Sequence, residues 1–101
     1  MNVTIRADGK RAIARLSGRF DFNAHRDFRE AVEAALQKKE FEEVVIDLAD
    51  VDYADSSALG MLLVLREKAT GVKKRLTLAN PSGIVKKALE IAHFEKLFSI
   101  S

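Results

Sequence analysis

Two adjacent hydroxyl groups, those of Ser56 and Ser57, have the greatest chemical potential in this sequence. They follow Asp55 and precede residues 58–65, a run without a polar side chain. The pattern predicts that a loop turns into a helix at the two serines. A hydroxyl at such a position can cap the helix, present a reactive oxygen, or accept a phosphoryl group.

A serine hydrolase is the first enzymatic interpretation of this corner. The nucleophile turn of such enzymes reads Gly-x-Ser-x-Gly, whereas residues 54–58 read Ala-Asp-Ser-Ser-Ala. His25 and His93 are the two candidates for the base, and neither has an evident orienting group. The sequence also has no Gly-Lys-Ser/Thr phosphate loop. We therefore expect no enzymatic activity, with a nucleotide-binding or enzymatic role as the weakest alternative.

Four aspartates lie close to the serines in the sequence: Asp47, Asp50, Asp52 and Asp55. They could form a magnesium site or an aspartyl-phosphate pocket of the receiver type. A receiver would need further acidic residues after its first strand and a lysine after a late strand, and neither is in place. Aspartate is also favoured in turns and helix caps, where we expect these four to act. We expect neither a metal nor another cofactor.

The composition is that of an ordinary globular protein, with 48% hydrophobic and 32% charged residues in a chain of 101. Residues 1–101 are predicted to form one domain. The absence of cysteine excludes disulfides and thiolate metal sites. A net charge of +2 and only seven per cent aromatic residues argue against direct nucleic-acid binding. No apolar run approaches the roughly 20 residues of a membrane span, so we expect a cytoplasmic protein without membrane contact.

Hydrophobic periodicity predicts the elements that position the serine corner. Residues 3–7 and 12–16 alternate around Asp8-Gly9, which is typical of a β-hairpin whose second strand ends at Ser17-Gly18. A loop follows, with Asn23 as the cap of the first helix. This helix ends near residues 37–39, and its apolar face comprises Phe28, Val32, Ala35 and Leu36.

The second half of the chain alternates between strands and helices. The predicted elements are a strand at 44–48, the serine helix to about residue 68, a strand at 76–79, a helix opened by Asn80-Pro81, and a helical turn with an extended end over 93–100. This alternation predicts parallel pairing through crossovers. The expected fold is α/β, with a mixed, mainly parallel sheet, an N-terminal hairpin and three to four helices. Residues 44–48 read as a central strand covered on both faces.

The serine helix is apolar all round in its first two turns. A surface helix of a small domain normally has a polar face. Either neighbouring elements enclose this helix, or part of it is exposed for a partner. Met61 is the residue we expect at such an interface, because its flexible thioether suits adaptable contacts.

Residues 44–48 and 55–63 together resemble the core signature of STAS domains, and more narrowly that of bacterial anti-sigma factor antagonists. The antagonist motif reads Asp-Ser-Ser-Gly-Leu-Gly after a strand and a loop. Residues 16–21 resemble the strand-Gly-x-x-Asp element of the family, which places its aspartate at Asp21. Residues 81–98 resemble the C-terminal helices. The sequence departs from the motif at Ala58, where glycine is usual.

The resemblance implies a partner switch. An ATP-dependent serine kinase, often the anti-sigma factor itself, would phosphorylate Ser56, and a metal-dependent serine phosphatase would reverse the modification. The unmodified form would bind the kinase or anti-sigma factor and free a sigma factor. The residues expected to bind the partner are Asp21, Asp55, Ser56, Ser57, Ala58 and Met61.

A second interpretation is a constitutive STAS subunit of a larger assembly, such as a lipid-transport ATPase complex. The serine corner would then be a docking surface that is never phosphorylated. Subunits of that kind often lack the paired serines, so Ser56 and Ser57 favour the antagonist.

Overall fold

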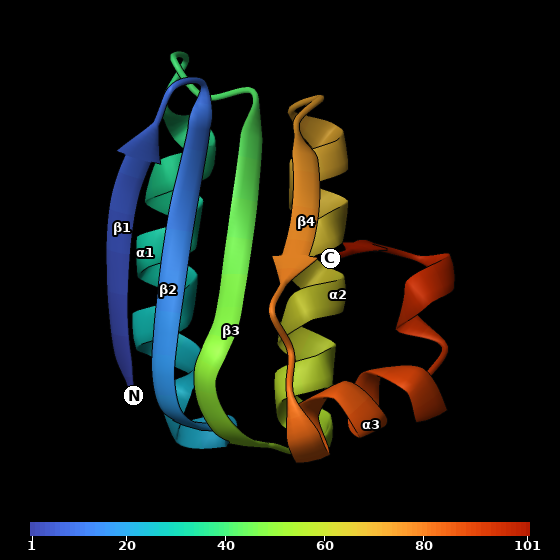
Figure 1. The fold of residues 1–101 in the computed structure, drawn as a ribbon. Coiled ribbons are helices and arrows are strands. Elements are labelled where there is room, and N and C mark those ends of the chain that lie inside the picture. Colours follow the sequence, from blue (N-terminus) through green and yellow to red (C-terminus); the bar gives the residue numbers. More distant parts are fainter.

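A five-stranded sheet organises the chain in a computed structural model that describes residues 1–101 (Figure 1). The order is β1-β2-β3-β4-β5, so each strand lies beside its neighbours in sequence. β1 pairs with β2 in antiparallel fashion, and all other pairs are parallel. The strands are β1 (Asn2–Asp8), β2 (Arg11–Phe20), β3 (Glu43–Ala54), β4 (Arg75–Ala79) and β5 (Ser99–Ile100). The predicted mixed sheet with its N-terminal hairpin is confirmed.

Three α-helices connect the parallel strands. They are α1 (His25–Gln37), α2 (Ser56–Gly71) and α3 (Gly83–Ile91), with the 3-10 turns η1 (Phe22–Ala24) and η2 (Phe94–Lys96). Figure 1 shows α1 and α2 on the same side of the sheet, behind it in this view, and α3 below the end of β4. Right-handed crossovers that advance in one direction place successive helices on one face. No helix of the chain combines the length and hydropathy that a membrane crossing requires.

Two strands are longer than the sequence predicts. β2 continues past Ser17-Gly18 to Phe20, and β3 continues past residue 48 to Ala54. The two extensions pair with each other through two register shifts, at 15–17 and at 18–19. Gly18 has φ +95°, a conformation that glycine tolerates. In the sequence, a glycine at this position resembles the end of a strand. The predicted ends were wrong because mutual pairing carries both strands through these irregular points.

One face of the sheet forms the core together with the helices. The buried residues on this face include Ala12, Ala14 and Leu16 of β2 and Val44, Ile46 and Leu48 of β3. They belong to a cluster of 24 buried residues. The predicted apolar face of α1 is confirmed, because all four of its residues are buried.

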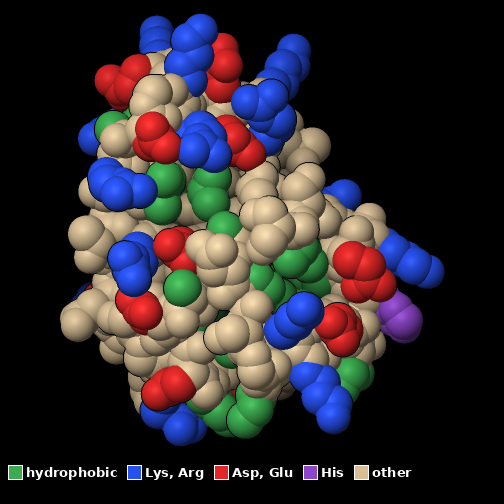
Figure 2. Space-filling view, viewed as in Figure 1, with side chains coloured by type: hydrophobic (Ala, Val, Ile, Leu, Met, Phe, Trp, Pro, Cys, Tyr) green, Lys and Arg blue, Asp and Glu red, His purple; other side chains and the backbone are tan.

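The other face of the sheet carries charged and polar side chains and has no helix in front of β2 and β3 (Figures 1 and 2). The expectation that residues 44–48 are covered on both faces is thus only partly met: no helix covers this face (Figure 1), although Val45 on it is only 7% exposed. Arg15 Nε donates to Asp50 Oδ2 at 2.9 Å, and this hydrogen bond, with the charges of Asp50 and Asp47, raises the pKa of Arg15. Thr77 donates to Glu43 at 2.6 Å. Such pairs satisfy the polar groups of this exposed face.

Two predicted helix starts also need correction. Ala24 is the N-cap of α1, whereas Asn23 lies within η1. Asp21 accepts the Asn23 N–H and so caps the 3-10 turn that leads into the helix. In the third helix Ser82 is the N-cap, so Pro81 precedes the helix and does not belong to its first turn. A 3-10 turn thus precedes α1, whereas Ser82, the N-cap of α3, is still extended.

Candidate functional site

Two strand-to-helix junctions meet at one edge of the sheet. β2 and β3 are parallel neighbours, and their last residues, Phe20 and Ala54, form a register pair. The Asp55 N–H donates to the Phe20 carbonyl at 3.3 Å, which ties the two junctions together. Asp21 and Asp55, the next residues of the two segments, therefore start neighbouring helical segments side by side. In open α/β sheets this carboxyl edge is where binding sites usually lie.

Asp55 performs the capping that the serines could have performed. It is the N-cap of α2, and its Oδ1 accepts the Ala58 N–H at 3.0 Å. Ser56 is then the first residue of α2 and is exposed, while Ser57 is half-buried. Because Asp55 satisfies the helix end, the Ser56 hydroxyl has no capping duty. Of the three uses that the sequence suggested for this hydroxyl, helix capping is excluded. The other two remain, namely a reactive oxygen and a phosphate acceptor.

Asp21 is held in place by its surroundings. Its Oδ1 accepts the Asn23 N–H at 3.0 Å, and its Oδ2 lies 3.5 Å from Arg19 Nε. The Arg19 guanidinium also lies over the Tyr53 ring, 4.1 Å from its centre. These contacts fix the aspartate at the corner and offset part of its charge. A partner would meet Asp21 in a defined position.

The two remaining predicted contact residues are largely covered. Ala58 is fully buried and Met61 is 8% exposed, so their side chains offer little surface in this conformation. The exposed apolar side chains of α2 are instead Leu63 at 38% and Val64 at 51%. The methyl group of Ala58 belongs to the core cluster, so the departure from glycine at this position does not alter the molecular surface.

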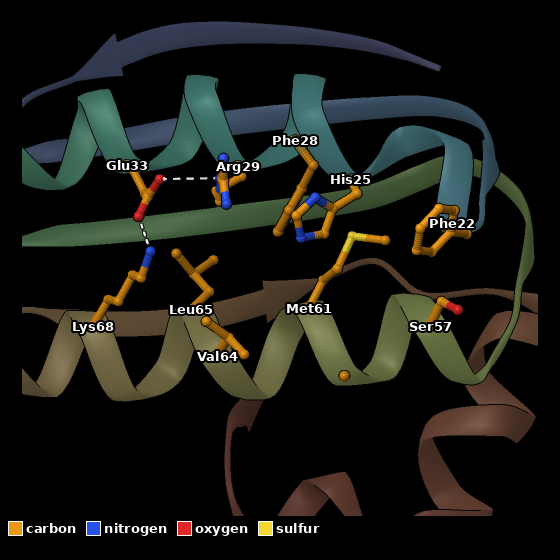
Figure 3. A pocket seen from close by; sticks show the side chains of 11 residues that line it. Phe22, His25, Phe28, Arg29, Glu33, Ser57, Met61, Val64, Leu65 and Lys68 are labelled. Carbon is orange, nitrogen blue, oxygen red and sulfur yellow. Dashed lines mark hydrogen bonds and ion pairs between the residues drawn. The ribbon is translucent and has the colours of Figure 1, made fainter.

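A groove of about 360 Å³ runs between α1 and α2, away from the serine corner (Figure 3). In Figure 3 Ser57 and Phe22 lie at one end of this α1–α2 groove, and Glu33 and Lys68 lie at the other. Phe22 is 72% exposed, and its ring stacks on His25 with centroids 6.3 Å apart. The other lining residues are Phe28, Arg29, Gly60, Met61, Val64 and Leu65. Two parallel helices thus form an apolar trough that begins beside the serines.

Sequence reasoning missed Phe22 and Val64 as surface residues. Phe22 stood in a predicted loop, and Val64 stood outside the main apolar stripes of its helix. The only sequence signal for Phe22 is that this aromatic residue stands between two polar residues of a predicted loop. The helical wheel placed Val64 outside the main apolar faces of its helix but did not show that it faces solvent.

The aspartates and histidines are dispersed. Asp47 accepts the Ala49 N–H at 3.0 Å and an amide hydrogen of Asn80 at 3.2 Å, so it acts in local structure on the open sheet face. No group of acidic residues and histidines is arranged to hold a metal ion. His25 lines the α1–α2 groove, whereas His93 follows α3 and lies 3.6 Å from Glu95. The structure does not bring the two histidines together around Ser56.

A family model described as "Mlab, STAS domain" matches residues 3–99. The chain belongs to the STAS domain family. A STAS-domain containing protein of Pseudomonas aeruginosa strain UCBPP-PA14 is 49% identical over 96 residues, which cover 94% of this chain and 92% of that protein. The anti-sigma F factor antagonist of Paenibacillus polymyxa is 34% identical over 65 residues, which cover 62% of this chain and 56% of the antagonist.

The STAS fold of the chain is also that of a solved antagonist. The Bacillus cell fate determinant SpoIIAA in its phosphorylated form superimposes with a TM-score of 0.74 at 19% identity, covering 99% of this chain and 91% of SpoIIAA. The family resemblance drawn from residues 44–48 and 55–63 is therefore confirmed, and so is the fold that it implied.

Proposed function

We propose that this STAS domain is an anti-sigma factor antagonist that works by partner switching, with Ser56 as the phosphorylated residue. The observation that carries the proposal is the exposed Ser56 hydroxyl at the start of α2, beside a cap that Asp55 already supplies. A kinase can therefore reach the oxygen without breaking a helix cap. The likeness in fold to the antagonist SpoIIAA, which has been solved in a phosphorylated form, supports control by phosphorylation.

The cycle has two chemical steps. In the first, Ser56 Oγ attacks the terminal phosphorus of ATP bound to a serine kinase, the bond to ADP breaks, and the hydroxyl proton leaves. In the second, a serine phosphatase hydrolyses the phosphate ester with water. The unmodified domain binds the anti-sigma factor or kinase through the surface around Asp21, Asp55, Ser56 and Ser57, and the phosphorylated domain releases it.

Phosphorylation should leave the fold intact. The modification adds about −1.5 to −2 charges next to the carboxylate of Asp55. The amino end of α2 returns about 0.3–1 kcal/mol in favour of that charge. Because Ser56 is exposed, water and salt screen the repulsion. The two effects are small and opposite, so the free energy of unfolding should change little.

Association should respond far more strongly than folding. A partner that covers the corner would remove the phosphate from water without providing an opposite charge. An uncompensated buried charge of this kind costs about 3 kcal/mol, which corresponds to about 150-fold in affinity. Phosphorylation would therefore switch binding and leave the fold in place.

A binding comparison tests the proposal. The anti-sigma factor or kinase from the same genome is titrated against the wild type, Ser56→Ala and Ser56→Asp. Ser82→Asp is the matched control, because Ser82 is an exposed serine at the start of α3 that gains the same charge away from the corner. We expect Ser56→Asp alone to lose binding. A folded Ser56→Asp that binds as tightly as Ser82→Asp would refute the switch.

The second candidate is a constitutive STAS subunit of a larger assembly, such as a lipid-transport ATPase complex. The family model that matches residues 3–99 is described as a STAS domain without a stated role, which fits this candidate as well as the antagonist. Intact mass measured on the protein purified from its native cells separates the two. A species heavier by one phosphate, mapped to Ser56, supports the antagonist, whereas a uniformly unmodified protein in a stable complex supports the subunit.

A further inference from the structure

The α1–α2 groove joins an apolar trough to a cationic end. Phe28, Met61 and Leu65 form its largely buried floor, and the exposed side chains of Val64 and Phe22 line it above (Figure 3). The groove spans α2 from Ser57 to Lys68, a length of about 16 Å at the helical rise. Its volume of about 360 Å³ lies within the range of about 300–1,000 Å³ that is typical of small-molecule sites. The groove therefore has room for one extended apolar chain.

The charged end has a surplus of positive charge. Lys68 Nζ bonds to Glu33 Oε1, and Arg29 Nε lies 3.7 Å from Glu33 Oε2 (Figure 3). Two cations thus share one carboxylate, which leaves a net charge of +1 there. Arg29 Nε lies 3.7 Å from Glu33 without a hydrogen bond, the Arg29 side chain is 54% exposed, and a guanidinium carries five N–H donors. Arg29 can accordingly hold a second carboxylate.

We propose that the α1–α2 groove binds a single-chain anionic amphiphile, such as a fatty-acid carboxylate. The carboxylate pairs with Arg29 and Lys68, and the chain lies along the exposed side chain of Val64 toward Phe22, with Met61 beneath it. A neutral chain would leave the surplus charge unpaired, and a cationic head group would be repelled by it. The site goes beyond the proposed switch, because it uses neither the Ser56 hydroxyl nor a protein partner.

Titration of the full chain with dodecanoate, below the concentration at which it forms micelles, tests the site. We expect saturable binding of one molecule by calorimetry. In NMR spectra the largest amide shifts should fall on Arg29, Met61, Val64 and Lys68. Dodecanol and dodecyltrimethylammonium carry the same chain with a neutral and a positive head. Both should bind at least about tenfold more weakly, because a charge-assisted hydrogen bond is lost.

Variants separate this site from general surface charge. Arg29→Gln with Lys68→Gln should weaken dodecanoate binding at least about tenfold. Lys86→Gln with Lys87→Gln removes the same charge from exposed positions of α3 and should leave the affinity unchanged. Glu33→Gln removes the competing carboxylate and should tighten binding. Circular dichroism verifies that each variant folds.

Three results would overturn the proposal. One is equal affinity for dodecanoate and dodecyltrimethylammonium, and another is equal weakening by the α3 control pair. The third is an absence of saturable binding to the wild type, which would make the groove a contact surface for protein side chains. None of these results depends on whether Ser56 is phosphorylated.

Discussion

The two helices that form the groove use their apolar residues differently. α1 buries the four apolar residues of one face, and the rest of its surface is predominantly polar. α2 also buries one face, including Ala58, Leu62 and Leu65, yet it leaves Leu63 and Val64 substantially exposed. An aspartate on the same edge of the sheet precedes each helix, since Asp21 caps the 3-10 turn that leads into α1 and Asp55 caps α2. Burial in the core explains every apolar residue of that α1 face. It does not explain the exposed apolar residues Leu63 and Val64 of α2.

The contrast shows where function adds to the demands of the fold. Exposed apolar side chains gain nothing from burial in the isolated chain, so those on α2 are available for the contacts that we propose. That surface starts about two helical turns after Ser56, the residue we propose as the switch. On the α1 side of the groove the charged residues Arg29 and Glu33 line the wall, so this wall is polar.

The largest expected effect comes from the buried face of α2. Leu62 is 2% exposed, and truncation by Leu62→Ala should lower the free energy of unfolding by about 2–5 kcal/mol because it leaves a cavity. Urea denaturation followed by circular dichroism measures the change. A loss below about 1 kcal/mol would mean that α2 is not packed as the structure has it.

A smaller effect should separate the cap from the switch. Asp55→Ala removes the acceptor of the Ala58 N–H and should cost about 1 kcal/mol of stability. Ser56→Ala should change stability by less than about 0.5 kcal/mol, because its hydroxyl is exposed and does not cap. The urea midpoints of unfolding of the Asp55→Ala and Ser56→Ala variants are measured under the same conditions and compared. A loss for Ser56→Ala as large as that for Asp55→Ala would contradict the division of roles.

The smallest effect belongs to the exposed wall of α2. Val64→Ser should shift the free energy of unfolding by no more than about 0.5 kcal/mol, because more than half of the Val64 side chain is already in water. The same substitution should weaken dodecanoate binding, since it removes part of the groove wall. Equal stability losses for Val64→Ser and Leu62→Ala would erase the distinction between the two faces.

Local patterns predicted the elements whose sequence and packing agree. The N-terminal hairpin, the buried stripe of α1 and the alternation of strands and helices all follow from short-range rules, although the hairpin turn lies at residues 9–10 and not at Asp8-Gly9. The ends of β2 and β3 did not follow, because each extension depends on pairing with the other, 34 residues away in the Phe20 and Ala54 pair. The identity of the α1 cap failed for a related reason, since Asp21 first caps a 3-10 turn.

The candidate site was predictable only in part. The Asp55-Ser56-Ser57 motif can be found by its residue types and Asp21 by the family resemblance, and the parallel pairing of β2 with β3 explains why they meet. The groove has no such signal. It depends on how α1 and α2 pack, and on a wall formed by Phe22 and Val64 that sequence cannot place in solvent.

One measurement tests the central claim that phosphate at Ser56 controls association and not folding. Protein carrying phosphoserine only at position 56 is compared with unmodified protein for affinity to the kinase or anti-sigma factor and for thermal unfolding. We predict about 150-fold weaker binding and a nearly unchanged free energy of unfolding. Unchanged affinity, or a loss of affinity matched by a loss of stability, would contradict the account.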